Sequence, residues 1–346
     1  MTTLLLSGLA VTAAVCASLT AAVIPLLRRA RVVDVPGDRS LHRTPVPRGG
    51  GLAIVLAASL ATWTAVLAAV HLQGAVRAMT GVDVALMGLA TVLAFALLGL
   101  IEDLFSVSVR TRLVLQLVLG AGLGLMAHSA FEVSLWWTPA ICVGTAALVN
   151  ATNFMDGANG LACGHALLTS LWYVQVAAVA PVAGLGLVMV SVAGACLGFL
   201  PFNTPRAKVF LGDSGSYALG SAWAFAVTAC LSRGVAVEAA SAPVLVLLAD
   251  TGYTLWMRLR AGQCWYEPHR LHVYQRLVCA GWPHWASALL VTLAAASCSA
   301  LAAGSLLTSN RLWMPQVAMA AVLIVYLKMP SIIGAPNPFP TLRRAR

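Results

Sequence analysis

Charge is the property that this sequence has least of. Only 9% of its 346 residues are charged and 60% are hydrophobic, whereas an ordinary soluble domain carries about 25% charged residues. This composition excludes a disordered chain and a water-soluble globule, because a single hydrophobic core could not bury so many nearly uncharged segments. Acidic residues are especially scarce, 11 against 21 lysines and arginines. The positions of these few carboxylates are therefore informative about function.

A cysteine framework is also missing. Six of the eight cysteines lie in or at the ends of apolar segments, where they are most simply small hydrophobic side chains. Cys264 and Cys279 lie between such segments without CxxC spacing, so neither structural disulfides nor a zinc site are expected. No positive charge precedes Arg28, which argues against a cleavable signal peptide and predicts a retained helix there.

Long apolar runs fill much of the chain. Eleven of them are near the roughly 17 to 25 residues that a membrane-spanning helix needs. They cover residues 4–27, 52–70, 84–101, 113–127, 139–149, 161–178, 182–200, 217–231, 240–257, 285–307 and 312–327. Because the runs are continuously apolar rather than alternating, they favour helices over a transmembrane barrel. The sequence predicts an all-α polytopic membrane protein with about 11 transmembrane helices, forming one integral-membrane domain over 1–346.

Basic residues predict how this domain lies in the membrane. If the first helix runs from outside to inside, 18 of the 21 lysines and arginines fall on the inner side, and only Arg77, Arg233 and Arg311 fall outside. The positive-inside rule then places the N-terminus in the periplasm and the C-terminus in the cytoplasm. Anionic lipid and phosphate at that surface account for the net charge of +10 without nucleic acid. The predicted cytoplasmic segments are 28–51, 102–112, 150–160, 201–216, 258–284 and a basic, proline-containing tail at 329–346.

Two of these loops end where a helix begins. The first ends in three glycines at 49–51, whose main-chain N–H groups, together with Arg48, would favour phosphate. A Pro/Gly-rich turn with an anchoring arginine is the alternative. The fourth contains Lys208 and, between glycines, Asp213, which suits a cation beside a phosphate or simply N-caps the helix.

The second loop begins with two adjacent carboxylates, Glu102 and Asp103, at the end of an otherwise uncharged helix. A helix dipole disfavours anions at its C-terminus, so either a divalent cation or nearby arginines should compensate them. In a chain so poor in charge, this pair points to function. Asp250 is an exception within an apolar run, where a packing or hydrogen-bonding role and a catalytic role are equally open.

The third loop repeats polar side chains at intervals of three residues. Asn150, Asn153 and Asp156 would share one side of a helical end, and Asn159 follows. Their oxygen atoms suit a cation or hydrogen bonding to a substrate, whereas a cluster of Asx turns is the alternative. An EF-hand is excluded, because its spacing and its terminal glutamate are missing.

The fifth loop carries two histidines close together. The spacing of His269, His272, Gln275 and Arg276 predicts a shared helical face. A zinc site would need a third ligand that the sequence does not offer nearby. Phosphate binding by histidine and arginine is therefore the favoured interpretation.

Five motifs occur in order along these loops: R-S-x-H-x-x-P-x-P-R-G-G-G, L-G-x-x-E-D, N-x-x-N-F-M-D-G-x-N-G-L, K-V-F-L-G-D-S-G-S and P-H-R-x-H. Together they resemble the polyprenyl-phosphate N-acetylhexosamine-1-phosphate transferases (glycosyltransferase family 4). This family includes the phospho-N-acetylmuramoyl-pentapeptide transferase and the enzymes that begin O-antigen, enterobacterial common antigen and teichoic acid assembly. The first and fifth motifs are most similar to the O-antigen and common-antigen initiating branch.

The resemblance implies an enzyme of the bacterial cytoplasmic (inner) membrane with its active site on the cytoplasmic face. The reaction would move an N-acetylhexosamine-1-phosphate, or a modified derivative, from a UDP-sugar to undecaprenyl phosphate, with UMP as the other product. Mg²⁺ would be the cofactor, with Mn²⁺ as an alternative. Members of this family can pair in the membrane, which leaves a homodimer open, although no interface motif stands out.

The matching motif positions imply roles for individual residues. Asp213, with Asp156 nearby, would hold Mg²⁺ against the donor diphosphate, while Asp103, helped by Glu102, would position or deprotonate the lipid phosphate. The nucleotide sugar and the phosphates would be bound by Asn150, Asn153, Asn159, Arg48, Lys208, His269, His272 and Arg276. Two positions depart from the family pattern, because Glu102 and Asn159 stand where aspartates are usual. The choice of donor sugar therefore stays open.

Two other functions compete with this interpretation. A transporter would place ionisable groups near the bilayer midplane and show paired, interrupted helices, whereas most of these carboxylates cluster at helix ends and no repeat is found. A catalytically inactive assembly scaffold is the second alternative, prompted by Glu102 and Asn159. Within the enzyme interpretation, direct attack by the lipid phosphate is favoured over an aspartyl-phosphate on Asp213, since a metal-bound carboxylate is a poor nucleophile.

Overall fold

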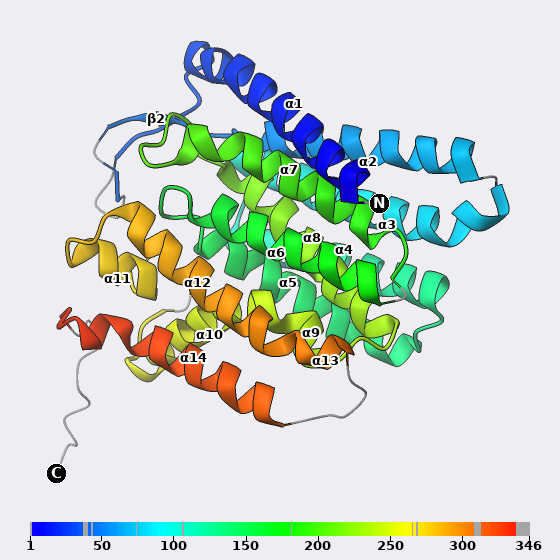
Figure 1. Cartoon of the computed structure of the whole chain (residues 1–346). Coiled ribbons are helices and arrows are strands. Elements are labelled where there is room, and N and C mark those ends of the chain that lie inside the picture. The colour runs from blue at the N-terminus through cyan, green and yellow to red at the C-terminus, as the bar shows by residue number, and fades with distance from the viewer. Residues whose placement is uncertain are drawn as a thin grey trace.

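The structure is a computed structural model that describes residues 2–36, 41–42, 44–73, 75–105, 107–180, 182–264, 266–267, 269–307 and 313–336. Its helices form a bundle in which the first and the last long helix lie on opposite flanks (Figure 1). Some positions discussed above lie outside the described residues: Arg39, Arg43, Arg311, Leu312 and the tail from 337 to 346.

Each predicted apolar run contains one long helix within the described part of the chain. These helices are α1 (Thr2–Arg29), α2 (Gly51–Gln73), α3 (Ala75–Phe105), α4 (Val109–Phe131), α5 (Thr138–Phe154), α6 (Leu161–Val179), α7 (Leu185–Asn203), α8 (Gly212–Ser232), α10 (Leu245–Arg260), α12 (His284–Ala302) and α14 (Met314–Ile332). The prediction of an all-α polytopic membrane protein is confirmed.

Eight of these helices are long and apolar enough to cross a membrane. The other three are α5 and α10, with 17 and 16 residues, and α8, which has 21 residues but begins with glycines, serines and an aspartate. The count of about 11 spans and the orientation of the termini therefore stay predictions.

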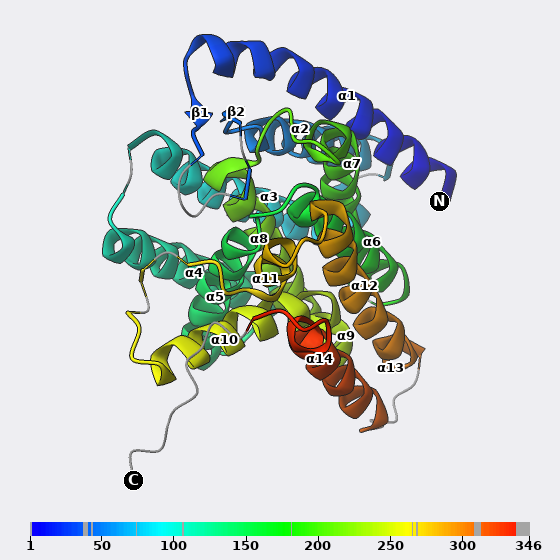
Figure 2. The same ribbon diagram turned by 90° about the vertical axis from the view of Figure 1, so that its left-hand side faces the viewer.

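Helix α8 runs through the middle of the bundle (Figure 2). Nearly all of its side chains are buried, and it packs against α3 and α5. The contact with α3 is close, since a Cβ atom at Gly99 would overlap the main-chain carbonyl of Asp213. A helix surrounded by protein does not need an apolar surface toward lipid, which explains its small and polar residues. Its first turn, with Asp213, is held at the centre of one end of the bundle.

The ninth apolar run is not one helix, contrary to the prediction for 240–257. It includes the end of α9 (Val237–Ser241), the 3₁₀ turn η2 (Ala242–Val244) and most of α10. Pro243 lacks a main-chain N–H and interrupts the helix. Three side chains of α6 satisfy carbonyl groups at the break: Trp172 donates to Ala239 at 2.9 Å, Tyr173 to Ala240 at 2.8 Å, and His165 to Pro243 at 2.8 Å.

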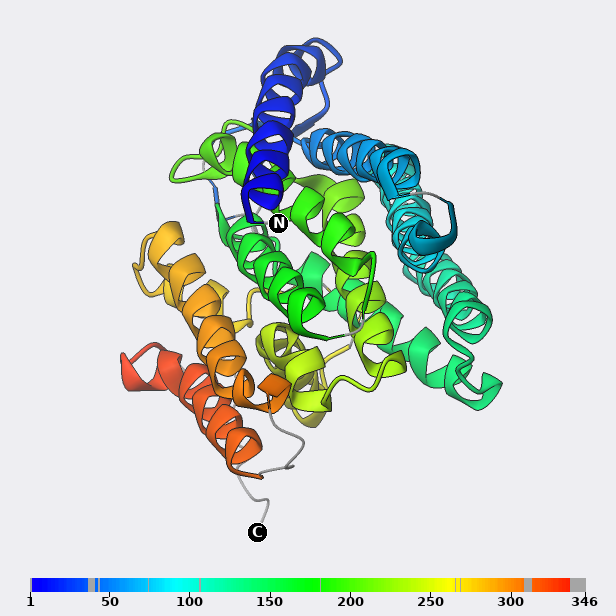
Figure 3. The same cartoon turned by 45° about the vertical axis from the view of Figure 1, so that its right-hand side comes forward.

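Short elements complete the bundle. At the end where the motif loops gather, β1 (Val33–Asp34) pairs antiparallel with β2 (Val46–Pro47), and α11 (Val273–Cys279) follows α10. Figure 2 shows β1, β2 and α11 on the side toward the viewer, around the start of α8. The remaining short elements are η1 (Leu135–Trp137) and α13 (Gly304–Leu307). Figure 3 shows α12 and α14 side by side on the flank away from α1.

Candidate active site

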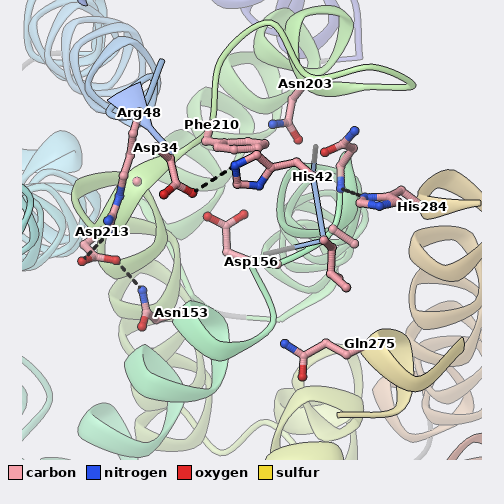
Figure 4. A pocket seen from close by; sticks show the side chains of 15 residues that line it. Asp34, His42, Arg48, Asn153, Asp156, Asn203, Phe210, Asp213, Gln275 and His284 are labelled. Carbon is pink, nitrogen blue, oxygen red and sulfur yellow. Dashed lines mark hydrogen bonds and ion pairs between the residues drawn. The ribbon is translucent and has the colours of Figure 1, made fainter. Parts of the chain in front are cut away.

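A polar cavity lies at this end of the bundle (Figure 4). Four of the five predicted loops contribute to it, and the polar residues in its lining are Asp34, His42, Arg48, Asn153, Asp156, Asn159, Asn203, Asp213, Gln275 and His284. Loops that are distant in sequence therefore meet in one site. The prediction that the motifs gather on one face of the membrane domain agrees with this arrangement.

Arg48 joins two acidic residues. Its Nε lies 3.1 Å from Asp103 Oδ1, and its Nη2 lies 2.7 Å from Asp213 Oδ2. Burial lowers the pKa of Arg48, but the Asp213 and Asp103 carboxylates more than offset this, so its pKa lies above the ordinary value. The guanidinium is thus a stable positive charge at the edge of the cavity.

Asp103 caps the start of α8. Its Oδ1 accepts the main-chain N–H of Asp213 and its Oδ2 accepts that of Ser214, both at 3.0 Å. With Arg48 as a further partner, this carboxylate has three hydrogen-bond donors, and its side chain is only 5% exposed. Asp103 therefore positions the start of α8, and its expected role of positioning or deprotonating the lipid phosphate stays a prediction.

Glu102 makes a different contact. Its Oε1 lies 3.3 Å from Arg112 Nη1, and neither it nor Asp103 lines the polar cavity. Of the two alternatives for compensating the pair, the described residues provide arginines: Arg112 for Glu102 and Arg48 for Asp103. Glu102 thereby orients Arg112 rather than touching a substrate in the polar cavity.

The glycines at 49–51 serve close packing. Gly50 N–H donates to the Phe210 carbonyl at 2.9 Å, and Gly51 N–H donates to the Leu211 carbonyl at 2.7 Å. A Cβ atom at Gly51 would also collide with the main chain of Gly215. These two N–H groups are therefore used between loops, which corrects the interpretation that the glycine run offers them to an anion. The packing places Arg48 next to Asp213.

The third loop supplies two asparagines with different contacts. Asn153 Nδ2 donates to Asp213 Oδ1 at 2.8 Å and to Ser216 Oγ at 3.0 Å. Asn150 lies one turn earlier and donates to Gln116 Oε1 at 2.5 Å. Asn153 therefore fixes the Asp213 carboxylate from the side opposite Arg48.

Asp156 is the acidic side chain that faces the polar cavity without a direct partner. Figure 4 shows its carboxylate projecting into the cavity, and no hydrogen bond or ion pair to that carboxylate forms within the described ranges. Loss of solvation and the nearby Asp213 carboxylate raise its pKa well above the ordinary value, and Arg48 acts in the opposite direction. Such a carboxylate is costly unless a positive charge comes to it.

A second cavity lies between α4, α5 and α10. One part of its wall is apolar, with Val109, Leu113, Ala147, Leu248 and Leu255. Its polar residues include Arg112, Asn150, His269 and His272. The two cavities share Asn153, Asp156, Gly157 and Gln275. They therefore adjoin beside Asp156, and ligands bound in both would meet there.

The two histidines of the fifth loop are close together in this second cavity. The ring centres of His269 and His272 are 4.9 Å apart, and His272 Nδ1 lies 3.0 Å from Asp250 Oδ1. Burial, His272 and Arg258 together lower the pKa of His269 to about 4, while Asp250 acts in the opposite direction. His269 is neutral at pH 7 and can serve phosphate as a hydrogen-bond donor rather than as a cation. Asp250 thus makes a hydrogen bond, which is one of the two roles considered for it, and the catalytic role stays open.

Two predicted phosphate ligands lie away from both cavities. Lys208 is exposed, with its Nζ 5.9 Å from the centre of the Phe202 ring. Arg276 Nη2 donates to the Pro336 carbonyl at 3.3 Å. The helical spacing grouped Arg276 with His272, but α11 begins only at Val273 and His272 is its N-cap. The shared face predicted for these residues is therefore wrong.

The polar cavity also contains residues that the motifs did not single out. His42 Nε2 lies 3.8 Å from Asp34 Oδ2, and its ring meets Phe210 edge to face at 4.9 Å. The His284 ring accepts the main-chain N–H of Asn159 at 3.3 Å through Nδ1. The first motif contains His42 and could have indicated it. His284, at the start of an apolar run, gave no such signal.

Mg²⁺ fits the residues at the junction of the cavities. Asp156 and Asp213 offer carboxylate oxygens, and Mg²⁺ is commonly held by one or two carboxylates together with substrate phosphates. The unpartnered Asp156 carboxylate is the feature that such an ion would satisfy. No group of three or more His, Cys, Asp or Glu side chains suited to a metal forms among the described residues. The remaining ligands would therefore come from the substrate and from water.

Comparison with known proteins identifies the family. The Glycosyl transferase family 4 profile matches residues 84–231. The chain is 32% identical to the decaprenyl-phosphate N-acetylglucosaminephosphotransferase of Mycobacterium leprae, over 78% of this chain and 75% of that protein. The chain belongs to the polyprenyl-phosphate N-acetylhexosamine-1-phosphate transferases. The resemblance predicted from the five loop motifs is confirmed.

Other relatives of this transferase are similar over comparable lengths. A phospho-N-acetylmuramoyl-pentapeptide-transferase of Desulforudis audaxviator is 30% identical, over 75% of this chain and 85% of that protein. A probable undecaprenyl-phosphate N-acetylglucosaminyl 1-phosphate transferase of Bacillus subtilis is 27% identical, over 78% and 77%. The profile match runs from α3 to α8 and so includes Asp103, Asn153, Asp156 and Asp213 of this transferase.

Proposed function

We propose that this transferase moves an N-acetylhexosamine-1-phosphate, or a modified derivative, from a UDP-sugar to undecaprenyl phosphate and releases UMP. The observation that carries the proposal is the junction beside Asp156, where a polar cavity and a partly apolar cavity share four residues. A nucleotide sugar is polar along its whole length and carries its negative charge on the diphosphate, whereas a polyprenyl phosphate has an anionic head and an apolar tail. Each cavity has the character of one of these two substrates.

The donor would bind in the polar cavity. Arg48 would contact its diphosphate, and the flat side chains of His42 and Phe210 would pack against the nucleotide, with Asn159 and Asn203 as hydrogen-bonding groups. Mg²⁺ held by Asp156 and Asp213 would neutralise charge that develops on the donor phosphates. The neutral Asn159 leaves the identity of the sugar open.

The acceptor would bind in the second cavity. Its isoprenoid tail would lie along the apolar wall between α4 and α10, where Leu113 and Leu255 are exposed to the cavity. Its phosphate would meet Arg112, which Glu102 holds in place, and the two histidines of the fifth loop. Arginine is well suited to this contact because its planar guanidinium donates two parallel hydrogen bonds to a phosphate.

The transfer itself needs alignment more than proton abstraction. An oxygen of the lipid phosphate attacks the β-phosphorus of the donor. The new O–P bond forms while the bond between that phosphorus and the bridging oxygen breaks, and UMP leaves with the electron pair. A phosphate monoester has a second pKa of about 6, so the acceptor is already largely dianionic at pH 7. The chain then contributes by positioning both substrates and neutralising their charge.

Direct attack agrees with the contacts of the aspartates. Both oxygens of Asp213 are engaged, one by Arg48 and one by Asn153, which disfavours it as a nucleophile that forms an aspartyl-phosphate. Asp103 likewise accepts from α8 and from Arg48. These contacts favour direct attack by the lipid phosphate over a nucleophilic or basic role for either aspartate.

We also propose that the site faces the cytoplasm at the bacterial inner membrane and begins the assembly of an O-antigen-like surface polysaccharide. Support comes from the excess of lysine and arginine in the loops that build the site. The proposal disfavours a transporter, because a transporter would carry ionisable groups near the bilayer midplane. The four acidic motif residues, Glu102, Asp103, Asp156 and Asp213, instead cluster at one end of the bundle.

The test is an assay of UMP release by purified protein with Mg²⁺, undecaprenyl phosphate and a panel of UDP-sugars. The proposal expects UMP with at least one donor and only when the lipid phosphate is present. If none of the UDP-sugars yields UMP, the enzymatic function is overturned and the inactive scaffold is favoured. Turnover that is unchanged in both Asp156→Asn and Asp213→Asn would overturn the site assignment while leaving the reaction in place.

A further inference from the structure

Asp250 is a fully buried carboxylate on α10, next to the second cavity but not part of its lining. Its relative exposure is 0%. A carboxylate in such a position is strongly destabilising unless several groups donate to it. The identity of those donors therefore indicates what the residue is for.

Donors reach Asp250 from three helices. His272 Nδ1 lies 3.0 Å from Oδ1, and the Tyr326 hydroxyl lies 2.6 Å from Oδ2. The main-chain N–H of Val273 lies 3.3 Å from Oδ1 and 3.1 Å from Oδ2, and Thr254 Oγ1 lies 3.2 Å from Oδ1. One carboxylate thus ties α10 to the start of α11 and to α14, and one of its partners is a predicted phosphate ligand.

These contacts fix the orientation of His272. A carboxylate accepts hydrogen bonds, so Nδ1 is the donor of this contact and Nε2 is the ring nitrogen that does not face Asp250. The ring is stacked with Phe154 and with Tyr274, each at 6.1 Å between centres, which opposes rotation. His272 lines the second cavity, and no hydrogen bond to its Nε2 forms among the described residues. Nε2 is therefore the atom of His272 that is left for a ligand there.

We propose that Asp250 is a positioning residue that acts on phosphosugar transfer through His272. It holds the ring with Nε2 toward the acceptor phosphate, a role that rests on the proposed function for its substrate. A hydrogen bond between Nε2 and an oxygen of the acceptor phosphate then aligns the attacking phosphate.

The first experiment observes the ring without any substrate. Protein labelled with ¹⁵N-histidine is studied by NMR in detergent at pH 7.5, and the His272 signals are assigned by their loss in His272→Gln. We expect the Nδ1–H tautomer in the wild type. In Asp250→Asn the amide can donate to Nδ1, so the tautomer should change to Nε2–H. An unchanged tautomer would overturn the proposal, whether or not the protein has transferase activity.

The second experiment measures coupling between the two residues. Asp250→Asn and His272→Gln are each expected to lower kcat for transfer about tenfold, with the KM for the UDP-sugar unchanged. The double variant should lose no more than His272→Gln alone, because Asp250 acts through that ring. Losses that multiply would overturn the proposal and indicate a structural role. Absence of transfer in the wild type would instead refute the proposed function, and the NMR result would still stand.

A milder variant covers the case in which Asp250→Asn fails to fold. Tyr326→Phe removes one donor to the Asp250 carboxylate. Because this carboxylate is then held less firmly, kcat should fall about threefold. Tyr173→Phe is the matched control, since its buried hydroxyl donates to the Ala240 carbonyl and does not contact the site. Equal losses of kcat in the two variants would contradict the coupling, whereas a loss confined to Tyr326→Phe supports it.

Discussion

Asp103 Oδ1 accepts the main-chain N–H of Asp213 at 3.0 Å, joining helices α3 and α8 through residues that are 110 positions apart. Arg48 bridges the same two residues from a third loop. Asp103 therefore holds the start of α8 in place, and Arg48 links it to Asp213. Among the described residues, Asp156 is the carboxylate that faces the polar cavity without a direct partner. This division of tasks leads to separate predictions for each aspartate.

Asp103→Asn should destabilise the fold. The amide offers one acceptor oxygen where the carboxylate serves two N–H groups and a guanidinium, so a loss of about 2 kcal/mol is expected. Turnover should fall roughly 10- to 100-fold because Asp213 shifts. Thermal unfolding in detergent and UMP release measure the two effects. Glu102→Gln is the control for stability, since Glu102 pairs with Arg112 and not with α8. A variant with wild-type stability but no turnover would instead indicate a base.

Asp156→Asn should separate stability from activity. Removing a poorly solvated carboxylate beside Asp213 is expected to leave the protein as stable as the wild type or to stabilise it by about 1 kcal/mol. The substitution also removes a predicted Mg²⁺ ligand. Added Mg²⁺ should therefore raise the melting temperature of the wild type but not that of the variant, and turnover should fall at least about 100-fold. An equal Mg²⁺ effect on both proteins would contradict the assignment of this ligand.

Arg112→Gln should weaken the binding of the acceptor and leave the binding of the donor unchanged. Arg112 lines the second cavity and is absent from the lining of the first, so the KM for undecaprenyl phosphate should rise about tenfold while the KM for the UDP-sugar stays the same. Arg110→Gln is a matched control two residues away, on an exposed side chain that lines neither cavity. A rise in the donor KM alone would reverse the assignment of the two cavities.

His269 predicts a pH dependence of stability. Burial, His272 and Arg258 hold its pKa at about 4 in the folded protein against an ordinary 6.5, with Asp250 acting in the opposite direction. The unfolded chain therefore binds the proton first, and stability should be lost as the pH falls from 6.5 toward 4. Melting temperatures from pH 7.5 to 4.5 test this. His269→Gln should show a shallower decline than the wild type, and parallel curves would refute the prediction.

Much of the fold follows from apolar runs, because a lipid environment leaves helices as the one arrangement these runs allow. The motif loops were predicted to lie on one side of the membrane, and four of them do line one cavity. The break at Pro243 is different, since the run from 240 to 257 remains apolar and the interruption depends on α6 to satisfy the freed carbonyls. Hydropathy alone gives no information on the side chains of α6 that donate to these carbonyl groups.

The site was less predictable from sequence than the fold. Asn153, Asp156 and Asp213 do meet, as their motifs suggested, but the direction of a long side chain depends on its neighbours. Lys208 is exposed, and Arg276 points to the Pro336 carbonyl. The contact of Asp250 with His272 joins α10 to the start of α11 across a loop whose path no motif encodes. Residues such as His284 enter the cavity through packing alone.

The central claim is that a phosphosugar, and not the sugar alone, crosses the junction beside Asp156. Donor labelled with ³²P in the β-phosphate tests it directly, with undecaprenyl phosphate as acceptor and separation of lipid from aqueous products. The account predicts that the label moves to the lipid and that the nucleotide product is unlabelled UMP, with transfer strongly reduced in Asp156→Asn. Label that stays in the aqueous phase as UDP would contradict it, because that result would mean transfer of the sugar alone.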